Sequence, residues 1–157
     1  MEGFQEASVV RKNDELTISW AGEGLDKVTI YQAATPDFDE TTGQVLAEAA
    51  VSPYTLTAAA DERLYFLLVG ANGARLRVAE RVMPMDSLVN FRDLGGYLTA
   101  DGRRTKWGRL LRSAAHDAIT DRDVAYLQKL RLKTVVDYRS TPEEADHPDR
   151  QIDGVQY

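Results

Sequence analysis

The chain has 157 residues, of which 43% are hydrophobic and 28% are charged, a composition typical of a globular protein. It contains no cysteine, which excludes disulfide bonds and thiolate metal ligands, and its two histidines, His116 and His147, argue against a catalytic zinc site. We therefore expect no metal and no cofactor. No apolar run approaches the roughly 18 residues of a membrane span, and the N-terminal residues lack the basic and apolar regions of a signal peptide. A cytoplasmic protein without a membrane span is expected.

The net charge of -6 is distributed unevenly along the chain. Residues 1–87 carry 7 basic and 14 acidic side chains, whereas residues 88–157 carry 12 and 11, which predicts two modules of different character. The overall acidity opposes binding to a phosphate backbone, so no nucleic-acid partner is expected. Within the second half, five cations fall close together: Arg103, Arg104, Lys106, Arg109 and Arg112. A face of this kind attracts a phosphorylated substrate, and a solvated charged surface is the alternative interpretation.

Short alternating stretches separated by turns predict an all-β sandwich in the first half. The predicted strands cover residues 16–20, 27–31, 45–50, 54–57, 63–69 and 75–82. Asn72-Gly73 predicts a type I′ hairpin between the last two strands. The region also resembles a fibronectin type III or immunoglobulin-like sandwich, since Trp20 ends an early strand and Tyr65 begins a late one. We expect both aromatic residues to lie in the core and to bind no ligand.

The sequence pattern of the second half predicts the beginning of an α/β domain. With the sandwich before it, the overall fold class is α+β. Pro84 and the polar residues after it mark the seam, so the expected domains are 1–84 and 85–157. The elements expected after the seam are a glycine-containing loop at 90–97, a turn at Asp101-Gly102, a strand at 107–113, a helix capped by Thr120, a strand at 132–137, a helix capped by Ser140 and the start of a strand at 155–157. The last strand would leave a sheet edge unpaired, and a dimer through strand pairing is therefore one alternative.

Three segments of the second half resemble the N-terminal pattern of the bacterial cysteine-dependent tyrosine/serine phosphatases. They are NFRDLGGY at 90–97, GRLLRS at 108–113 with DGR before it at 101–103, and the D-x-R step at Asp137 and Arg139. The resemblance implies hydrolysis of a phosphate monoester, on a protein or another molecule, through a cysteinyl-phosphate intermediate. The family's nucleophile lies further on, in a segment of the form HCxxGKDRTG that these 157 residues do not contain. We therefore expect an N-terminal, truncated part of such a domain that is inactive alone.

The resemblance also implies roles for particular residues. Candidates for active-site support or phosphate binding are Asn90, Phe91, Arg92 and Asp93, whose loop would pack beside the phosphate loop. For Arg92 and Asp93 an internal ion pair that fixes the loop is an equal alternative. Structural roles are expected for three residues, Arg112, Asp137 and Arg139, with the two arginines bonding to Asp137, Glu143 or Glu144. No residue of the chain is assigned as catalytic, although His116 and Asp137 are minor candidates for the general acid.

Two functions remain open at this point. The leading hypothesis is a phosphatase in which the sandwich is a spacer, a docking surface or a lid. The other is a non-catalytic adaptor that carries a phosphatase-derived remnant, which the missing cysteine favours. The reading frame after the codon for Tyr157 separates them, because a continuation into HCxxGKDRTG favours the enzyme. The sequence does not distinguish phosphotyrosine, phosphoserine and phosphoinositide substrates.

Overall fold

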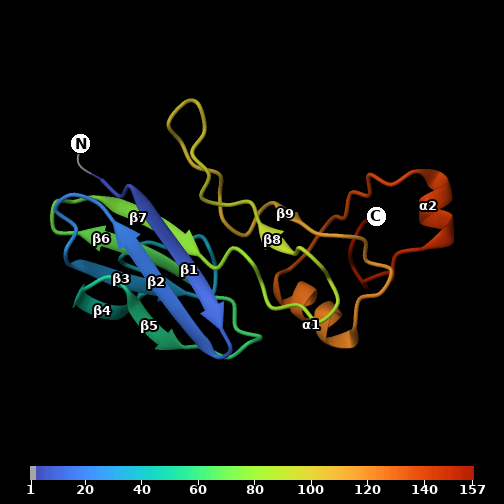
Figure 1. The fold of residues 1–157 in the computed structure, drawn as a ribbon, viewed down its shortest axis with the longest axis horizontal. Helices are drawn as coiled ribbons and strands as arrows, with labels where there is room; N and C mark the ends of the chain where they lie inside the picture. Colours follow the sequence, from blue (N-terminus) through green and yellow to red (C-terminus); the bar gives the residue numbers. More distant parts are fainter. Residues whose placement is uncertain (1–2) are drawn as a thin grey trace. The chain divides into compact units, whose positions relative to one another are not determined.

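The computed structural model describes residues 3–157, so residues 1–2 of the expected first domain lie outside the described part (Figure 1). The chain forms two compact units, and each is discontinuous in sequence. The first unit comprises the chain through Val82 together with Asp93–Leu110, and the second comprises Met83–Arg92 together with Leu111–Tyr157. The segment Asp93–Leu110, named the strap below, therefore belongs with the first unit although it follows the predicted seam.

Two antiparallel sheets build the first unit (Figure 1). The smaller sheet has the order β1-β2-β5, formed by Glu6–Lys12, Glu15–Ala21 and Tyr54–Thr57. The larger has the order β4-β3-β6-β7, formed by Gln44–Ala50, Val28–Ala33, Tyr65–Gly70 and Arg75–Ala79. Buried residues of both sheets, among them Ile18, Trp20, Ile30 and Phe66, make one hydrophobic cluster. The unit is thus the predicted sandwich, and Trp20 and Tyr65 are core residues as expected.

Six of the seven strands coincide with predicted segments, but β1 was not predicted. Its sequence EASVVRK gives only a weak alternation, and Val9 is its one fully buried residue. The β6–β7 hairpin forms as expected, yet its turn is not type I′. That turn needs two residues at positive φ, and only Gly73, at φ 83°, meets the requirement in the loop. The amide of Gly73 donates to the carbonyl of Gly70 (2.9 Å), so a turn followed by one left-handed glycine closes the hairpin.

The strap forms its own small hairpin, with a bridge between Leu98 and Arg104 around the predicted Asp-Gly turn. Trp107 fixes it to the larger sheet, since the indole Nε1 donates to the carbonyl of Arg77 (3.1 Å). Gly95 is required beneath this ring, because a Cβ atom there would lie 2.5 Å from the Cα of Trp107. The close fit anchors the strap to the larger sheet at Trp107.

The second unit contains two helices, α1 (Asp121–Lys129) and α2 (Thr141–Asp146). The two-residue strands β8 (Arg92–Asp93) and β9 (Leu111–Arg112) pair with each other, so the expected strand at 107–113 is reduced to two residues. Both helices begin where the sequence predicts. The hydroxyl of Thr120 accepts the amide hydrogen of Asp123 (3.1 Å), which completes the expected cap. The apolar face of α1 contributes Tyr126 and Leu127 to a small core. Neither helix within residues 3–157 has the length and apolar character to cross a bilayer.

The predicted strand at 132–137 is wrong in extent. One parallel bridge joins Thr134 to Gln156, with hydrogen bonds from the amide of Val135 to the carbonyl of Gln156 (2.8 Å) and from the amide of Gln156 to the carbonyl of Lys133 (2.9 Å). The expected strand at 155–157 is reduced to the same bridge. A β-branched run becomes a strand only where a neighbour pairs along its length, and here the pairing ends after one residue, leaving Val136 64% exposed.

Candidate functional site

The candidate site is a hollow of about 650 Å³ in the second unit, named the motif hollow. Two segments supply most of its wall, the stretch from Leu111 to His116 and the extended stretch from Leu132 to Arg139. Four of the predicted site residues line it: Phe91, Arg112, Asp137 and Arg139. The fold therefore brings part of the NFRDLGGY motif, the end of GRLLRS and the D-x-R step to one concave surface.

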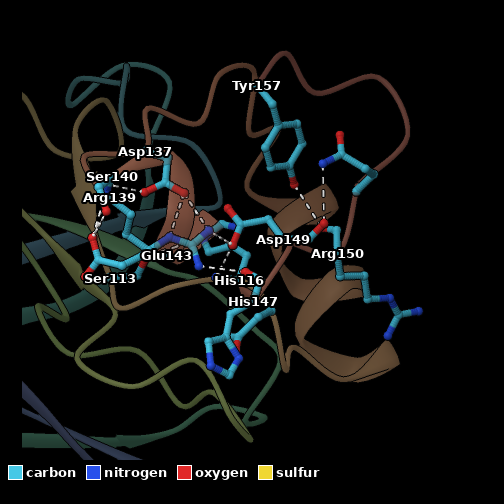
Figure 2. A network of polar contacts seen from close by, with 12 residues as sticks. Ser113, His116, Asp137, Arg139, Ser140, Glu143, His147, Asp149, Arg150 and Tyr157 are labelled. Atoms are coloured by element: carbon cyan, nitrogen blue, oxygen red, sulfur yellow. Dashed lines mark hydrogen bonds and ion pairs between the residues drawn. The ribbon is translucent and has the colours of Figure 1, made fainter. Parts of the chain in front are cut away.

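Arg139 organises one side of the motif hollow (Figure 2). Its guanidinium donates to Asp137 Oδ2 through Nε (2.7 Å), to Asp149 Oδ1 through Nη2 (2.7 Å) and to the carbonyl of His147 through Nη1 (2.7 Å). The hydrogen bond from Arg139 lowers the pKa of Asp137. Because a general acid must hold its proton, this ionised carboxylate is a poor candidate for that role, and the geometry fits a clamp that fixes the chain.

His116 lies buried at the back of the motif hollow. Its Nε2 is 3.2 Å from Ser113 Oγ, and its backbone amide donates to Asp149 Oδ1 (2.9 Å). Burial lowers the pKa of the imidazole, against the opposing charges of Asp149 and Asp137. A neutral ring at neutral pH can position Ser113, but it carries no extra proton to donate as a general acid. Asp149, which joins His116 to Arg139, was not predicted because no local motif marks it.

Asp93 has a different environment, within the first unit. Its buried carboxylate accepts hydrogen bonds from Arg63 Nη2 (2.9 Å) and from the amides of Gly95 (2.8 Å) and Gly108 (2.8 Å). For Asp93 these contacts match the alternative of an internal ion pair that fixes the loop, whereas the same alternative is wrong for Arg92, whose side chain makes no ion pair within residues 3–157. Arg63 was not predicted as the partner, because it precedes Asp93 by 30 residues and the sequence assigned the two residues to different modules.

The remaining predicted residues are Asn90 and Phe91, which differ in burial, and Arg92 and Arg112, whose side chains are unpaired in the described part of the chain. Phe91 is buried in the core of the second unit, and Asn90 is exposed with φ 58°. Within residues 3–157, the side chains of Arg92 and Arg112 make no hydrogen bond or ion pair. The expectation that Arg112 bonds to Asp137, Glu143 or Glu144 is therefore wrong. Glu143 instead accepts from Ser140 through the amide (2.9 Å) and the hydroxyl (2.6 Å), which leaves Arg112 as an uncompensated cation at the motif hollow.

Comparison with known proteins agrees with this geometry. Residues 83–157 match the tyrosine phosphatase family. A protein of Cupriavidus necator named as a candidate tyrosine-protein phosphatase is 45% identical over 67 residues, which cover 40% of this chain and 24% of that protein. The matched part thus spans about a quarter of the relative's length. The resemblance stated from the sequence is supported to this extent.

Among solved structures, pectate lyase Pel3 from Pectobacterium carotovorum aligns with 59% of this chain and 30% of its own, at a TM-score of 0.34 and 13% identity. A likeness this weak carries no functional meaning.

Proposed function

We propose that the chain is the N-terminal part of a protein-tyrosine/serine phosphatase that hydrolyses phosphate monoesters, on a phosphorylated protein or another molecule. The observation that carries the proposal is the match of residues 83–157 to the tyrosine phosphatase family. The convergence of three motif segments on the motif hollow supports it.

The proposed reaction proceeds through a cysteinyl-phosphate intermediate. A thiolate attacks phosphorus as the ester P–O bond breaks and an acid protonates the leaving oxygen; water then displaces the thiol and releases phosphate. The 157 residues contain no cysteine, so they do not supply the nucleophile. Their proposed contribution is one wall of the site, in which Arg112 presents a free positive charge and Arg139 fixes the chain beside it.

The purified chain is expected to show no vanadate-sensitive turnover of p-nitrophenyl phosphate. Sustained turnover by homogeneous material, removed by vanadate, would overturn the proposal. In a longer chain that includes the HCxxGKDRTG segment, activity is expected, and its Cys→Ser variant should abolish it. Arg112→Met should then lower kcat/KM by about tenfold or more, because it removes a cation near the phosphate. Arg103→Met is the matched control, since Arg103 is exposed and does not line the motif hollow.

The non-catalytic adaptor is the second candidate. It predicts that the natural protein binds its partners without phosphatase activity at any length. Under either function, we propose that the sandwich is a fibronectin type III-like module. The support is its division into a three-stranded and a four-stranded sheet around Trp20 and Tyr65.

A further inference from the structure

The first unit contains a second concave surface that the phosphatase motifs do not explain. It consists of two adjoining hollows of about 710 and 480 Å³. They share a wall made by one strand of the larger sheet and the strap: Leu76, Arg77, Gly96, Arg104 and Trp107. We propose that this surface, named the strap groove, is a docking site for an acidic peptide segment of a partner protein. The proposal does not depend on catalysis.

The charges of the strap groove carry the inference. Three arginines of its wall have only backbone carbonyls as hydrogen-bond acceptors. Arg77 donates to the carbonyl of Phe38, Arg81 to those of Asp93 (2.7 Å) and Gly95 (2.9 Å), and Arg104 to that of Gly96 (2.8 Å). These bonds hold the guanidinium groups in place without neutralising them.

A fourth cation, Lys106, lies exposed in the wall of the larger hollow, with no hydrogen bond or ion pair from its side chain within residues 3–157. Arg75, which also lines the larger hollow, pairs with Glu40. Elsewhere in the described chain most arginines pair with carboxylates: Arg11, Arg63, Arg103, Arg109, Arg122, Arg139 and Arg150. Within residues 3–157, the strap groove thus contains four cations that no carboxylate neutralises.

Acidic side chains of the strap groove offset only part of this charge. Asp37 pairs with Arg109, which lies outside the lining. The hydroxyls and amides of Thr41 and Thr42 lower the pKa of Asp39 to about 2, so it stays ionised at one end of the larger hollow. Glu6 is the acidic residue of the smaller hollow. Four cations without a carboxylate partner, against these two carboxylates, leave the groove attractive to an anionic ligand.

Shape and rigidity favour a peptide over other anions. The two hollows share a wall, and half-buried Leu76 adds apolar surface between the charges. A single phosphate ion would use neither the length nor the apolar surface. Trp107 is already buried and bonded, so the wall is formed before a ligand binds and little ordering cost is expected.

The test measures binding of a fluorescein-labelled, glutamate-rich peptide to the whole chain by fluorescence anisotropy. The same peptide with glutamine in place of glutamate is the ligand control. Arg104→Glu and Lys106→Glu should each weaken binding by about tenfold, and rising salt should weaken it further. Lys27→Glu is the matched protein control, because it makes the same charge change on an exposed residue of the same unit that lines neither hollow. Circular dichroism checks the fold of each variant.

Binding of the glutamate peptide that Arg104→Glu and Lys106→Glu weaken and Lys27→Glu does not would support the proposal. Equal losses in all three variants would overturn it in favour of unspecific attraction. Equal binding of the glutamine peptide, or no binding of either peptide, would also overturn it. Co-sedimentation with phosphatidylserine vesicles without peptide binding would reassign the surface to a membrane and so exclude a peptide site.

Discussion

Two parts of the phosphatase-like stretch, the strap and the extended segment 132–139, are stabilised in different ways. The strap is fixed to the sandwich through a buried ion pair, in which the side chains of Arg63 and Asp93 are 6% and 0% exposed. The extended segment has one bridge to Gln156 and exposes Tyr138 to 94%. The difference teaches that a single sequence pattern can include one segment that a buried ion pair anchors and another that one bridge holds.

Asp93→Ala should have the largest effect. It leaves Arg63 buried without a counter-charge and removes the acceptor for two amides, so we expect a loss of about 3–5 kcal/mol in the stability of the first unit. Hydrogen exchange at the amides of Gly95 and Gly108 measures it, since both donate to this carboxylate. Exchange in α1 should stay unchanged.

Asp101→Ala is the control for that experiment. Asp101 pairs with Arg103 on the same strap, but the two side chains are 50% and 84% exposed. An exposed pair contributes about 0–1 kcal/mol, so exchange in the strap should hardly change. Similar effects of Asp93→Ala and Asp101→Ala would contradict the view that burial makes the strap's anchor strong.

Asp123→Asn should have the next largest effect, in the second unit. The buried carboxylate of Asp123 accepts from the amides of Asp86 (2.7 Å) and Ser87 (3.0 Å). Burial would raise its pKa, but these hydrogen bonds, with those from the Ser87 hydroxyl and the Thr120 amide, outweigh burial and lower the pKa to about 2. The ionised group should therefore contribute about 2 kcal/mol.

The sign of this effect can be tested by pH. Because the folded-state pKa lies below the usual value near 4, the contribution is complete above about pH 4 and is lost as the pH falls towards 2. Urea unfolding of the second unit, followed by hydrogen exchange in α1, should show this acid limb. In Asp123→Asn the free energy of unfolding should depend less on pH in this range. An unchanged pH dependence would argue that the bonds from Asp123 to the amides of Asp86 and Ser87 do not stabilise the second unit.

Arg139→Met should have the smallest effect. The guanidinium side chain is 19% exposed and bonds to Asp137 and Asp149, so its removal should cost about 1 kcal/mol. The amide of His116, which donates to Asp149, should exchange faster, and the pKa of Asp137 should rise when the guanidinium is lost. Hydrogen exchange measures the change at the His116 amide, and an NMR pH titration measures the pKa of Asp137. A loss as large as that of Asp93→Ala would remove the contrast between the two segments.

Local sequence patterns predicted much of the fold. Alternation located β2 to β7, and Thr120 with its acidic first turn located the start of α1, because these signals depend on residues a few positions apart. The same reasoning missed β1, whose single buried residue, Val9, gives no period. It also assigned the wrong turn type to Asn72-Gly73, since the dipeptide fits more than one turn.

The sequence by itself determined the sandwich, the two helices and the likeness to tyrosine phosphatases, since each depends on short-range periodicity or a contiguous motif. Only the tertiary structure decided that Asp93 bonds to Arg63, that Arg139 bonds to Asp149 and that the strap belongs with the sandwich. It also decided that residues 132–137 form no full strand. The physical reason is common to all four: an ion pair and a sheet ladder need partners that chain folding brings close, and their positions in the sequence leave no local trace.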